Sequence, residues 1–385
     1  MKVKQTTLKA SAASGTIADA LKSLQDIAPH WVLVFGGVEL FTRPEAVAAV
    51  LSAFPESVIM GCSTAGEIAG NEVRDNACVI TAVHLDSATL RRGYTEITGM
   101  DDSRSAGERI GQQLSQAGAG LKAVMVLGPG VQINGTALVE GIESQLGSGI
   151  PITGGLAGDG GAFRQTWTLS NAGSKDNGIV AIGFCGEELN FAHGSFGGWE
   201  VFGPARKVTR CEGNVLFELD GEPALEVYKR YLGDHAKGLP ASGLLFPFAM
   251  LGEDHSAIGL IRTILAIDEA AGSLTLAGAI NDGGYLKLMH ASTDRLVNGA
   301  ESAAEGARKM FTADGDSLAV LVSCVGRKLV MGDRIDEEVE AVADVVGSKA
   351  TLTGFYSYGE ISPFTPGVSC QLHNQTMTIT WLGER

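Results

Sequence analysis

Three short segments of this sequence place an acidic side chain at the same position behind a hydrophobic run. Each reads as a strand end, four residues, a glycine and then an acid, in GCSTAGE at 61–67, TGGLAGD at 153–159 and GFYSYGE at 354–360. The glycine supplies a backbone conformation or a close approach that a Cβ would forbid. The carboxylate accepts hydrogen bonds from exposed amides in the turn. Two interpretations stay open: one corner built three times by a repeated architecture, or a pocket lined by these corners.

The sequence lacks the common catalytic and nucleotide-binding motifs. No GxxxxGK[ST] loop is present, and no GxGxxG opens a helix after a strand. The segment 61–65 approaches the GxSxG elbow of serine hydrolases, but it lacks the last glycine, and strands follow where that elbow requires a helix. Cys62 has no histidine that the sequence places beside it as a base. We therefore expect no enzymatic activity, with acid and base chemistry at Tyr356, Tyr358 and Glu360 as the alternative.

A Gly-Pro-Gly sequence at 128–130 lies at an expected strand-to-helix turn and is followed by Asn134. Exposed backbone amides at such a turn bind anions. The other interpretation is a plain turn in which Asn134 caps the following helix.

Cysteine and histidine spacing argues against disulfides and against zinc. The six cysteines contain no CxxC pair, and the seven histidines contain no HxxxH, HxH or HExxH grouping. This pattern suits neither a disulfide scaffold nor a closed zinc site. The spacing of these residues therefore predicts no bound metal ion.

The elements that position the turns follow one repeated order, read from hydrophobic periodicity. The first copy has a helix at 16–26, a strand at 31–36, a helix at 43–53, a strand entering the turn at 57–68, and strands at 78–85 and 88–96. The second has a helix at 104–117, a strand at 122–127, a helix at 134–146, a strand and turn at 150–160, and strands at 165–170, 178–184 and 189–196. The third has helices at 300–312 and 335–346 and strands at 317–323, 350–361, 368–373 and 376–382.

Between the second and third copies the pattern changes. We expect a helix at 222–232 and strand-like runs at 243–250, 258–267, 273–280 and 285–290. The Gly- and Pro-containing segment 197–204 is the expected junction. The sequence thus predicts a mixed α/β or α+β protein of two domains, 20–200 and 201–385, built on repeated helix-strand-helix-strand-hairpin units with mainly antiparallel mixed sheets.

Composition restricts the partners. The formal net charge is -15 and no basic run appears, so nucleic acid and anionic membranes are poor partners. No window approaches the roughly 18 apolar residues that a membrane-spanning helix needs. The lysine-bearing N-terminus has no apolar stretch behind it as a secretion signal would. We expect a cytoplasmic protein.

Five segments, in order, make this chain resemble the FIST sensory domain with its N-terminal and C-terminal halves. They are GCSTAGEI at 61–68, GGLAGDG at 154–160, GNVLFELDGEPALEVYKRYLG at 213–233, GFYSYGEISP at 354–363 and HNQT at 373–376. The resemblance covers almost the whole chain from about residue 30.

The resemblance implies a bacterial or archaeal input domain for signal transduction that binds a small ligand such as an amino acid. Related proteins are linked to histidine kinases, diguanylate cyclases or methyl-accepting receptors. Because no output domain follows in this sequence, we expect it to regulate a separate histidine kinase or a diguanylate cyclase or phosphodiesterase. A homo-oligomer is compatible with the sequence, which does not define the oligomeric state.

FIST proteins of this size also resemble the NosP group of haemoproteins, which sense nitric oxide. The resemblance therefore makes haem b a candidate cofactor, with an amino acid or other metabolite as the alternative ligand. A haem needs an axial ligand and an apolar pocket. His193 and His235, which have Gly or aromatic neighbours, are the axial candidates, and the spacing selects neither.

An amino-acid-like ligand would present an amine, which needs carboxylates, and a carboxylate, which needs backbone amides or a cation. The first and third turns offer both kinds of group. The His-Asn pair at 373–374 either supplies further polar contacts to this ligand or only stabilises the turn between the last two strands. We therefore expect the ligand to contact Cys62, Ser63, Thr64, Glu67, Tyr356, Tyr358, Glu360, His373 and Asn374.

Overall fold

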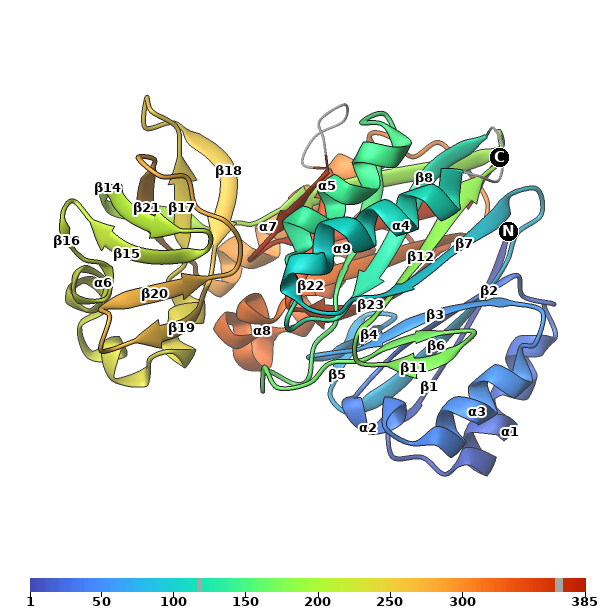
Figure 1. Cartoon of the computed structure of the whole chain (residues 1–385). Helices are drawn as coiled ribbons and strands as arrows, with labels where there is room; N and C mark the ends of the chain where they lie inside the picture. Colours follow the sequence, from blue (N-terminus) through green and yellow to red (C-terminus); the bar gives the residue numbers. More distant parts are fainter. Residues whose placement is uncertain (116–119, 364–369) are drawn as a thin grey trace.

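The structure of the chain, a computed structural model, describes residues 1–115, 120–363 and 370–385 (Figure 1). The repeated unit predicted from periodicity is present in three copies.

The first copy comprises β1 (Lys2–Lys9), α1 (Ser14–Gln25), β2 (Trp31–Gly36), α2 (Val38–Phe41), α3 (Pro44–Ala53), β3 (Val58–Ser63), β4 (Glu67–Ala69), β5 (Glu72–Arg74) and β6 (Ala77–His84). The second comprises β7 (Thr89–Glu96), α4 (Ser103–Ser115), β8 (Leu121–Gly128), α5 (Gly135–Leu146), β9 (Ile152–Leu156), β10 (Thr168–Ser170), β11 (Gly173–Lys175) and β12 (Gly178–Cys185). The third comprises β13 (Leu189–Phe196), α7 (Thr293–Arg308), β22 (Ser317–Cys324), α8 (Val325–Met331), α9 (Asp336–Val346), β23 (Ala350–Ser357), β24 (Gly359–Pro363), β25 (Cys370–His373) and β26 (Met377–Glu384).

Each copy gives four strands to its own sheet and one hairpin to another sheet. The β4–β5 hairpin pairs with β23 of the third copy, β10–β11 with β3 of the first, and β24–β25 with β9 of the second. The three six-stranded sheets therefore have equivalent orders, β1-β6-β2-β3-β10-β11, β7-β12-β8-β9-β24-β25 and β13-β26-β22-β23-β4-β5. In each, one pair is parallel (β2–β3, β8–β9 or β22–β23) and the other pairings are antiparallel. This confirms the predicted mixed, mainly antiparallel sheets.

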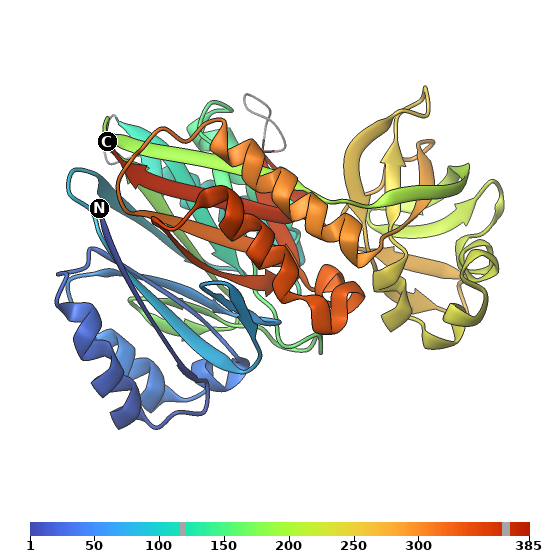
Figure 2. The same cartoon turned by 180° about the vertical axis from the view of Figure 1, so that it is seen from behind.

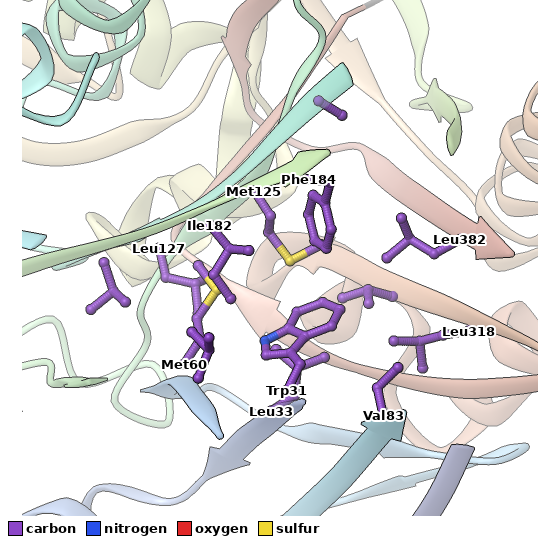
Figure 3. Close-up of a cluster of buried hydrophobic side chains, with 14 of the residues drawn as sticks. Trp31, Leu33, Met60, Val83, Met125, Leu127, Ile182, Phe184, Leu318 and Leu382 are labelled. Atoms are coloured by element: carbon purple, nitrogen blue, oxygen red, sulfur yellow. The ribbon is translucent and has the colours of Figure 1, made fainter. Parts of the chain in front are cut away.

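The inner faces of the three sheets share one core. Figure 3 shows Trp31, Met125 and Leu318, one from each sheet, pointing toward one another. The helices cover the outer faces, where α1 and α3, α4 and α5, and α7 and α9 form three separate outer clusters (Figures 1 and 2). Because both faces of β2 are covered, all six of its residues are buried, and its sequence is a continuous apolar run.

Residues 200–290, between β13 and α7, form what we name the inserted subdomain, which lies to one side of the three-sheet body (Figure 1). It comprises β14 (Glu200–Glu212), β15 (Val215–Leu219), β16 (Glu222–Pro223), α6 (Ala224–Leu232), β17 (Phe248–Leu251), β18 (Ala257–Arg262), β19 (Ile264–Asp268), β20 (Ser273–Leu276) and β21 (Tyr285–His290). It has its own core around Tyr228 and Phe248. The chain enters it at the predicted junction and afterwards returns to the body, so strands from both predicted domains, 20–200 and 201–385, share sheets.

Some elements differ from the prediction for physical reasons. The sequence analysis missed β1, because its mixture of Lys, Gln and Thr is that of a half-exposed edge strand and lacks an apolar run. It also missed α8, which follows β22 without a connecting loop. Helix α7 begins at Thr293 instead of residue 300 because the Ser292 hydroxyl accepts the Arg295 N–H and caps it. The ends at 116–117 and 368–369 of two predicted elements lie outside the described residues.

Candidate functional site

The three acid-bearing turns meet where the three sheets converge. Backbone bonds join the first and third turns, from Ala65 N to Tyr356 O at 2.8 Å and from Tyr356 N to Gly66 O at 2.8 Å. The second turn joins both, through Gly158 N to Ser63 O at 2.8 Å and Tyr358 N to Leu156 O at 3.2 Å. The structure therefore brings the predicted turns into a single cluster.

The turn carboxylates accept hydrogen bonds from the protein's own donors. Glu67 accepts from the Thr64 hydroxyl and from Ala77 N at 2.8 Å. Glu360 accepts from the Ser357 hydroxyl at 2.6 Å and from the backbone and side chain of Thr376 at 3.2 and 3.1 Å. Burial raises the pKa of Glu67 to about 7 and that of Glu360 to about 8, because desolvation disfavours the charged carboxylate. Glu67 thus ties the first turn to the start of β6, and Glu360 ties the third turn to the residue before β26.

The remaining predicted residues near the first turn are also buried in the protein. The Ser63 hydroxyl donates to Gly158 O at 2.7 Å and accepts from Trp167 N at 2.8 Å. Cys62 packs in the shared core, where burial raises its thiol pKa well above the ordinary value. Both residues link the sheets to one another.

Tyr356 and His373 are similarly enclosed. The Tyr356 hydroxyl donates to Glu338 at 2.5 Å, and burial raises its pKa. His373 Nε2 lies 2.8 Å from Ser362 O, and burial lowers its pKa to about 4, so the ring is neutral at pH 7. Neither side chain lines the cavity that lies between the second copy and the inserted subdomain.

A cavity of about 630 Å³ separates the second copy from the inserted subdomain, and we name it the interface cavity. Two of the predicted ligand residues, Tyr358 and Asn374, line it. Asn374 is 2% exposed, and its Nδ2 donates to His373 O at 3.0 Å. Its Oδ1 has no hydrogen-bond partner among the described residues. A buried amide oxygen without a donor costs about 1–3 kcal/mol, so this atom marks a place where a ligand would gain a hydrogen bond.

Tyr358, in contrast to Asn374, lines the cavity with a polar group that already has hydrogen-bond partners. Its hydroxyl bonds to the Asp159 carboxylate and accepts from Gly161 N at 3.0 Å and from Phe163 N at 3.3 Å. Its ring stacks on Phe163 with centroids 4.0 Å apart and an interplanar angle of 14°. The pair offers a flat aromatic surface to the cavity.

The first turn of α5 also faces the interface cavity. Asn134 accepts the Ala137 N–H at 3.1 Å and caps the helix, which confirms the capping interpretation of this loop. Gly135 lines the cavity, and its backbone N–H donates to no described residue. Helix N-termini favour negative or hydrogen-bond-accepting groups, so this wall suits an acceptor.

The inserted subdomain supplies the remaining wall. Asn214 lies there with its Nδ2 bonded to Leu276 O at 2.8 Å, and Leu265, Leu276 and Gly278 add apolar surface. Sequence reasoning missed these residues, because nothing in the strand-like run 273–280 marks them as facing the body. Besides the predicted residues Tyr358 and Asn374, the loop 128–134 was the part of this site with a recognisable sequence signal.

The two haem candidates lie in different parts of the chain. His193 is in β13, 5% exposed, and burial lowers its pKa. His235 lies on the surface of the inserted subdomain, with its ring 5.1 Å from that of Phe246. Neither histidine lines the interface cavity. Haem binding stays a prediction from the resemblance.

Two further observations apply to the described part of the chain. No three His, Cys, Asp or Glu side chains gather there as a metal ion would require. Across the same residues, the helices fall short of the length and apolar character that a membrane crossing demands.

Comparison with solved structures finds weak likeness over the full length. A cyanuric acid hydrolase from A. caulinodans is 12% identical with a TM-score of 0.40, covering 100% of this chain and 99% of that one. A chorismatase is 10% identical with a TM-score of 0.34, covering 99% and 98%. Because both are enzymes, the expectation that this chain is not an enzyme is contradicted. Likeness at this level assigns no activity to the chain.

Sequence comparison is more specific. An uncharacterized protein of Methanocaldococcus jannaschii is 34% identical over 88 residues, which is 23% of this chain and 17% of that protein. The chain therefore matches about a sixth of that relative's length. Family models match the FIST N domain over residues 30–222 and the FIST C domain over residues 224–363. FIST domains are sensory domains for small ligands in signalling proteins, and this chain belongs to the FIST family.

Proposed function

We propose that this chain is a sensor that binds a small molecule in the interface cavity. The observation that carries the proposal is the buried Oδ1 of Asn374, which has no partner among the described residues and lines a cavity of about 630 Å³. Ligand sites are concave and mostly apolar, with a few polar groups that orient the ligand. The interface cavity has this composition.

The walls indicate the chemistry of the ligand. Asn374 Oδ1 calls for an N–H or O–H donor, and the Gly135 N–H, which has no acceptor among the described residues, calls for an acceptor. Between them, Phe163 and Leu276 favour an apolar or planar body. We infer a small metabolite that carries a donor at one end and an acceptor at the other.

A ligand in this cavity would contact both the body and the inserted subdomain. Its binding energy therefore depends on how the two parts are placed, and it favours the placement in which both contacts form. The buried Arg327 lies at the connection between the two parts, where it donates to Gly197 O and, at 2.8 Å, to Leu296 O. We propose that a separate histidine kinase or cyclic-di-GMP enzyme detects this placement.

A ligand screen by thermal unfolding tests the proposal, with amino acids, nucleobases and short carboxylic acids as probes. Asn374→Leu removes the buried oxygen and Ala137→Phe fills the cavity, while Ala48→Phe, on the exposed face of α3, is the matched control. We expect a stabilising compound to act on the wild type and on Ala48→Phe and to lose its effect in both cavity variants. A compound that stabilises all four proteins equally would place its site elsewhere and overturn the proposal.

The family resemblance offers a more specific alternative to a metabolite, in which the protein binds haem and senses nitric oxide. An absorption spectrum after expression with haem precursor separates the two ligands. A Soret band that shifts with nitric oxide and disappears in His193→Ala or His235→Ala would favour haem. A colourless protein that takes up no added hemin would favour the metabolite.

A further inference from the structure

Arg262 carries a buried charge that no described carboxylate neutralises. It ends β18 in the inserted subdomain and is 4% exposed. Its Nε donates to Ala279 O at 2.9 Å and its Nη1 to Ile261 O at 3.1 Å, and both acceptors are neutral carbonyls. Burial lowers its pKa to about 10, so the guanidinium is still charged at pH 7. A buried charge without a counter-ion is destabilising.

The other buried arginine shows the contrast. Arg327 lies 2.7 Å from Glu338, and neither side chain has any exposed surface. The same fold therefore supplies a carboxylate to one buried guanidinium and none, among the described residues, to the other.

A second cavity, of about 300 Å³, opens beside Arg262. Its wall on the body side includes Thr136 in the first turn of α5 and Leu372 in β25. The Thr136 hydroxyl is buried without a partner among the described residues, and its backbone N–H, in the first turn of α5, donates to none of them. A guanidinium, a hydroxyl and a helix N-terminus all favour the same kind of ligand, which is an anion.

Two acidic residues also line this second cavity, and both already have partners. Glu140 lies 2.8 Å from Arg104, and Glu143 accepts the Cys370 N–H at 2.8 Å. They follow Thr136 by one and two turns along α5, so they limit an anion to the end of the cavity near Thr136 and Arg262.

We propose that the second cavity is an oxyanion site, in which a carboxylate or phosphate group bridges Arg262 of the inserted subdomain and the first turn of α5 in the body. The planar guanidinium presents N–H donors in the spacing that two oxygens of such a group accept. The site goes beyond the proposed function because it lies apart from Asn374. Leu372 borders both cavities, and Gly278, which lines the interface cavity, packs so close to Arg262 that a Cβ would be 2.9 Å from Nε.

Thermal unfolding in sodium phosphate, sodium acetate and sodium chloride at equal ionic strength tests the site. We expect phosphate or acetate to raise the Tm of the wild type by about 2–4 °C over chloride. A response to acetate alone assigns the site to carboxylates, and a response to phosphate alone assigns it to phosphates. In Arg262→Met the Tm in chloride should equal or exceed that of the wild type, because the unpaired charge is gone, and the anion response should disappear.

Phosphate also stabilises proteins in general, by exclusion from their surface, and this effect acts on every variant alike. The difference between wild type and variant is therefore the informative quantity. Thr136→Val removes only the hydroxyl and should reduce the rise in Tm that the anion causes. This variant tests the site if Arg262→Met does not fold. Asn374→Leu should keep the full response, which separates this site from the interface cavity. An identical anion response in the wild type, Arg262→Met and Thr136→Val would overturn the proposal, as would no response in the wild type.

Discussion

Arg327 of α8 and Glu338 of α9 form an ion pair 2.7 Å long with no exposed surface on either side chain. Glu338 also accepts the hydroxyl groups of Ser323 at 3.0 Å and Tyr356 at 2.5 Å. The pair thus connects two helices, the sheet beneath them and, through Gly197, the entrance to the inserted subdomain.

Removing one member of this pair should be strongly destabilising. Glu338→Gln leaves the guanidinium buried without a counter-ion, and we expect a loss of about 3–5 kcal/mol in the free energy of unfolding. Chemical denaturation measures it. The double variant Arg327→Met with Glu338→Leu is the control, and it should recover most of the loss. A single variant as stable as the wild type would show that the charge is not buried.

Stability should fall as the pH rises from 6.5 to 8. The folded pKa values of Glu67 and Glu360, about 7 and about 8, lie above the value near 4.5 of the unfolded chain. The folded state therefore holds protons that the unfolded state has lost, and the stability that they contribute disappears as the pH passes the folded pKa. Each group contributes a slope of at most about 1.4 kcal/mol per pH unit.

The titration of His373 does not contribute to the change in stability between pH 6.5 and 8. Its folded pKa of about 4 lies below the ordinary value of 6.5, so its contribution is complete above pH 6.5 and is lost only as the pH falls. Urea denaturation at several pH values gives the slope, and Glu360→Gln should flatten it. An unchanged slope in that variant would assign the dependence to other groups.

Alanine at the central glycines of the parallel strand pairs should destabilise the protein. A Cβ at Gly61 would lie 2.2 Å from Val34 O, and one at Gly354 would lie 1.9 Å from Leu321 O. The strands must move apart to admit a methyl group, at a cost of about 1–3 kcal/mol or more. Gly15→Ala is the matched control, because Gly15 lies in α1 with nothing within 4 Å of the added Cβ. This control should be neutral or should gain up to about 1 kcal/mol, so equal losses in the three variants would refute the steric argument.

The cap of α5 should be measurable separately from the ligand. Asn134→Ala removes the acceptor of the Ala137 N–H and should lower the free energy of unfolding by about 1 kcal/mol. Asn134→Asp keeps an acceptor and should stay close to the wild type. Chemical denaturation of both variants without ligand measures their free energies of unfolding. Equal values for the Ala and Asp variants would show that the side chain at position 134 does not stabilise α5 by capping it.

Elements buried on both faces were predictable because their local sequence determines them. β2 agrees with its predicted residues 31–36, since a continuous apolar run that follows His30 and ends in a pair of glycines is typical of a strand buried on both faces. The exchange of hairpins was not predictable, because β4 is short and its pairing with β23 depends on contacts across almost the whole chain. Local periodicity carries no information on such partners.

The candidate site was predictable only in part, for the same reason. Tyr358 and Asn374 were selected as polar groups at strand ends and do line the interface cavity, whereas Glu67 and Glu360 are used to tie turns. Arg262 had a signal that was overlooked: it is the single charge in the run 258–265, whose other residues are apolar apart from one threonine. A lone arginine in such a run indicates a buried charge, and a buried charge needs a partner.

The exchange of hairpins also bears on how the protein is made. The β4–β5 hairpin leaves the ribosome with the first copy, but the strand that it joins, β23, is synthesised only after the second copy and the inserted subdomain. Until then the nascent chain carries unpaired strand edges, which favour association with other chains. The first copy therefore cannot complete its strand pairing until the third copy has been synthesised, and the three sheets can close only then.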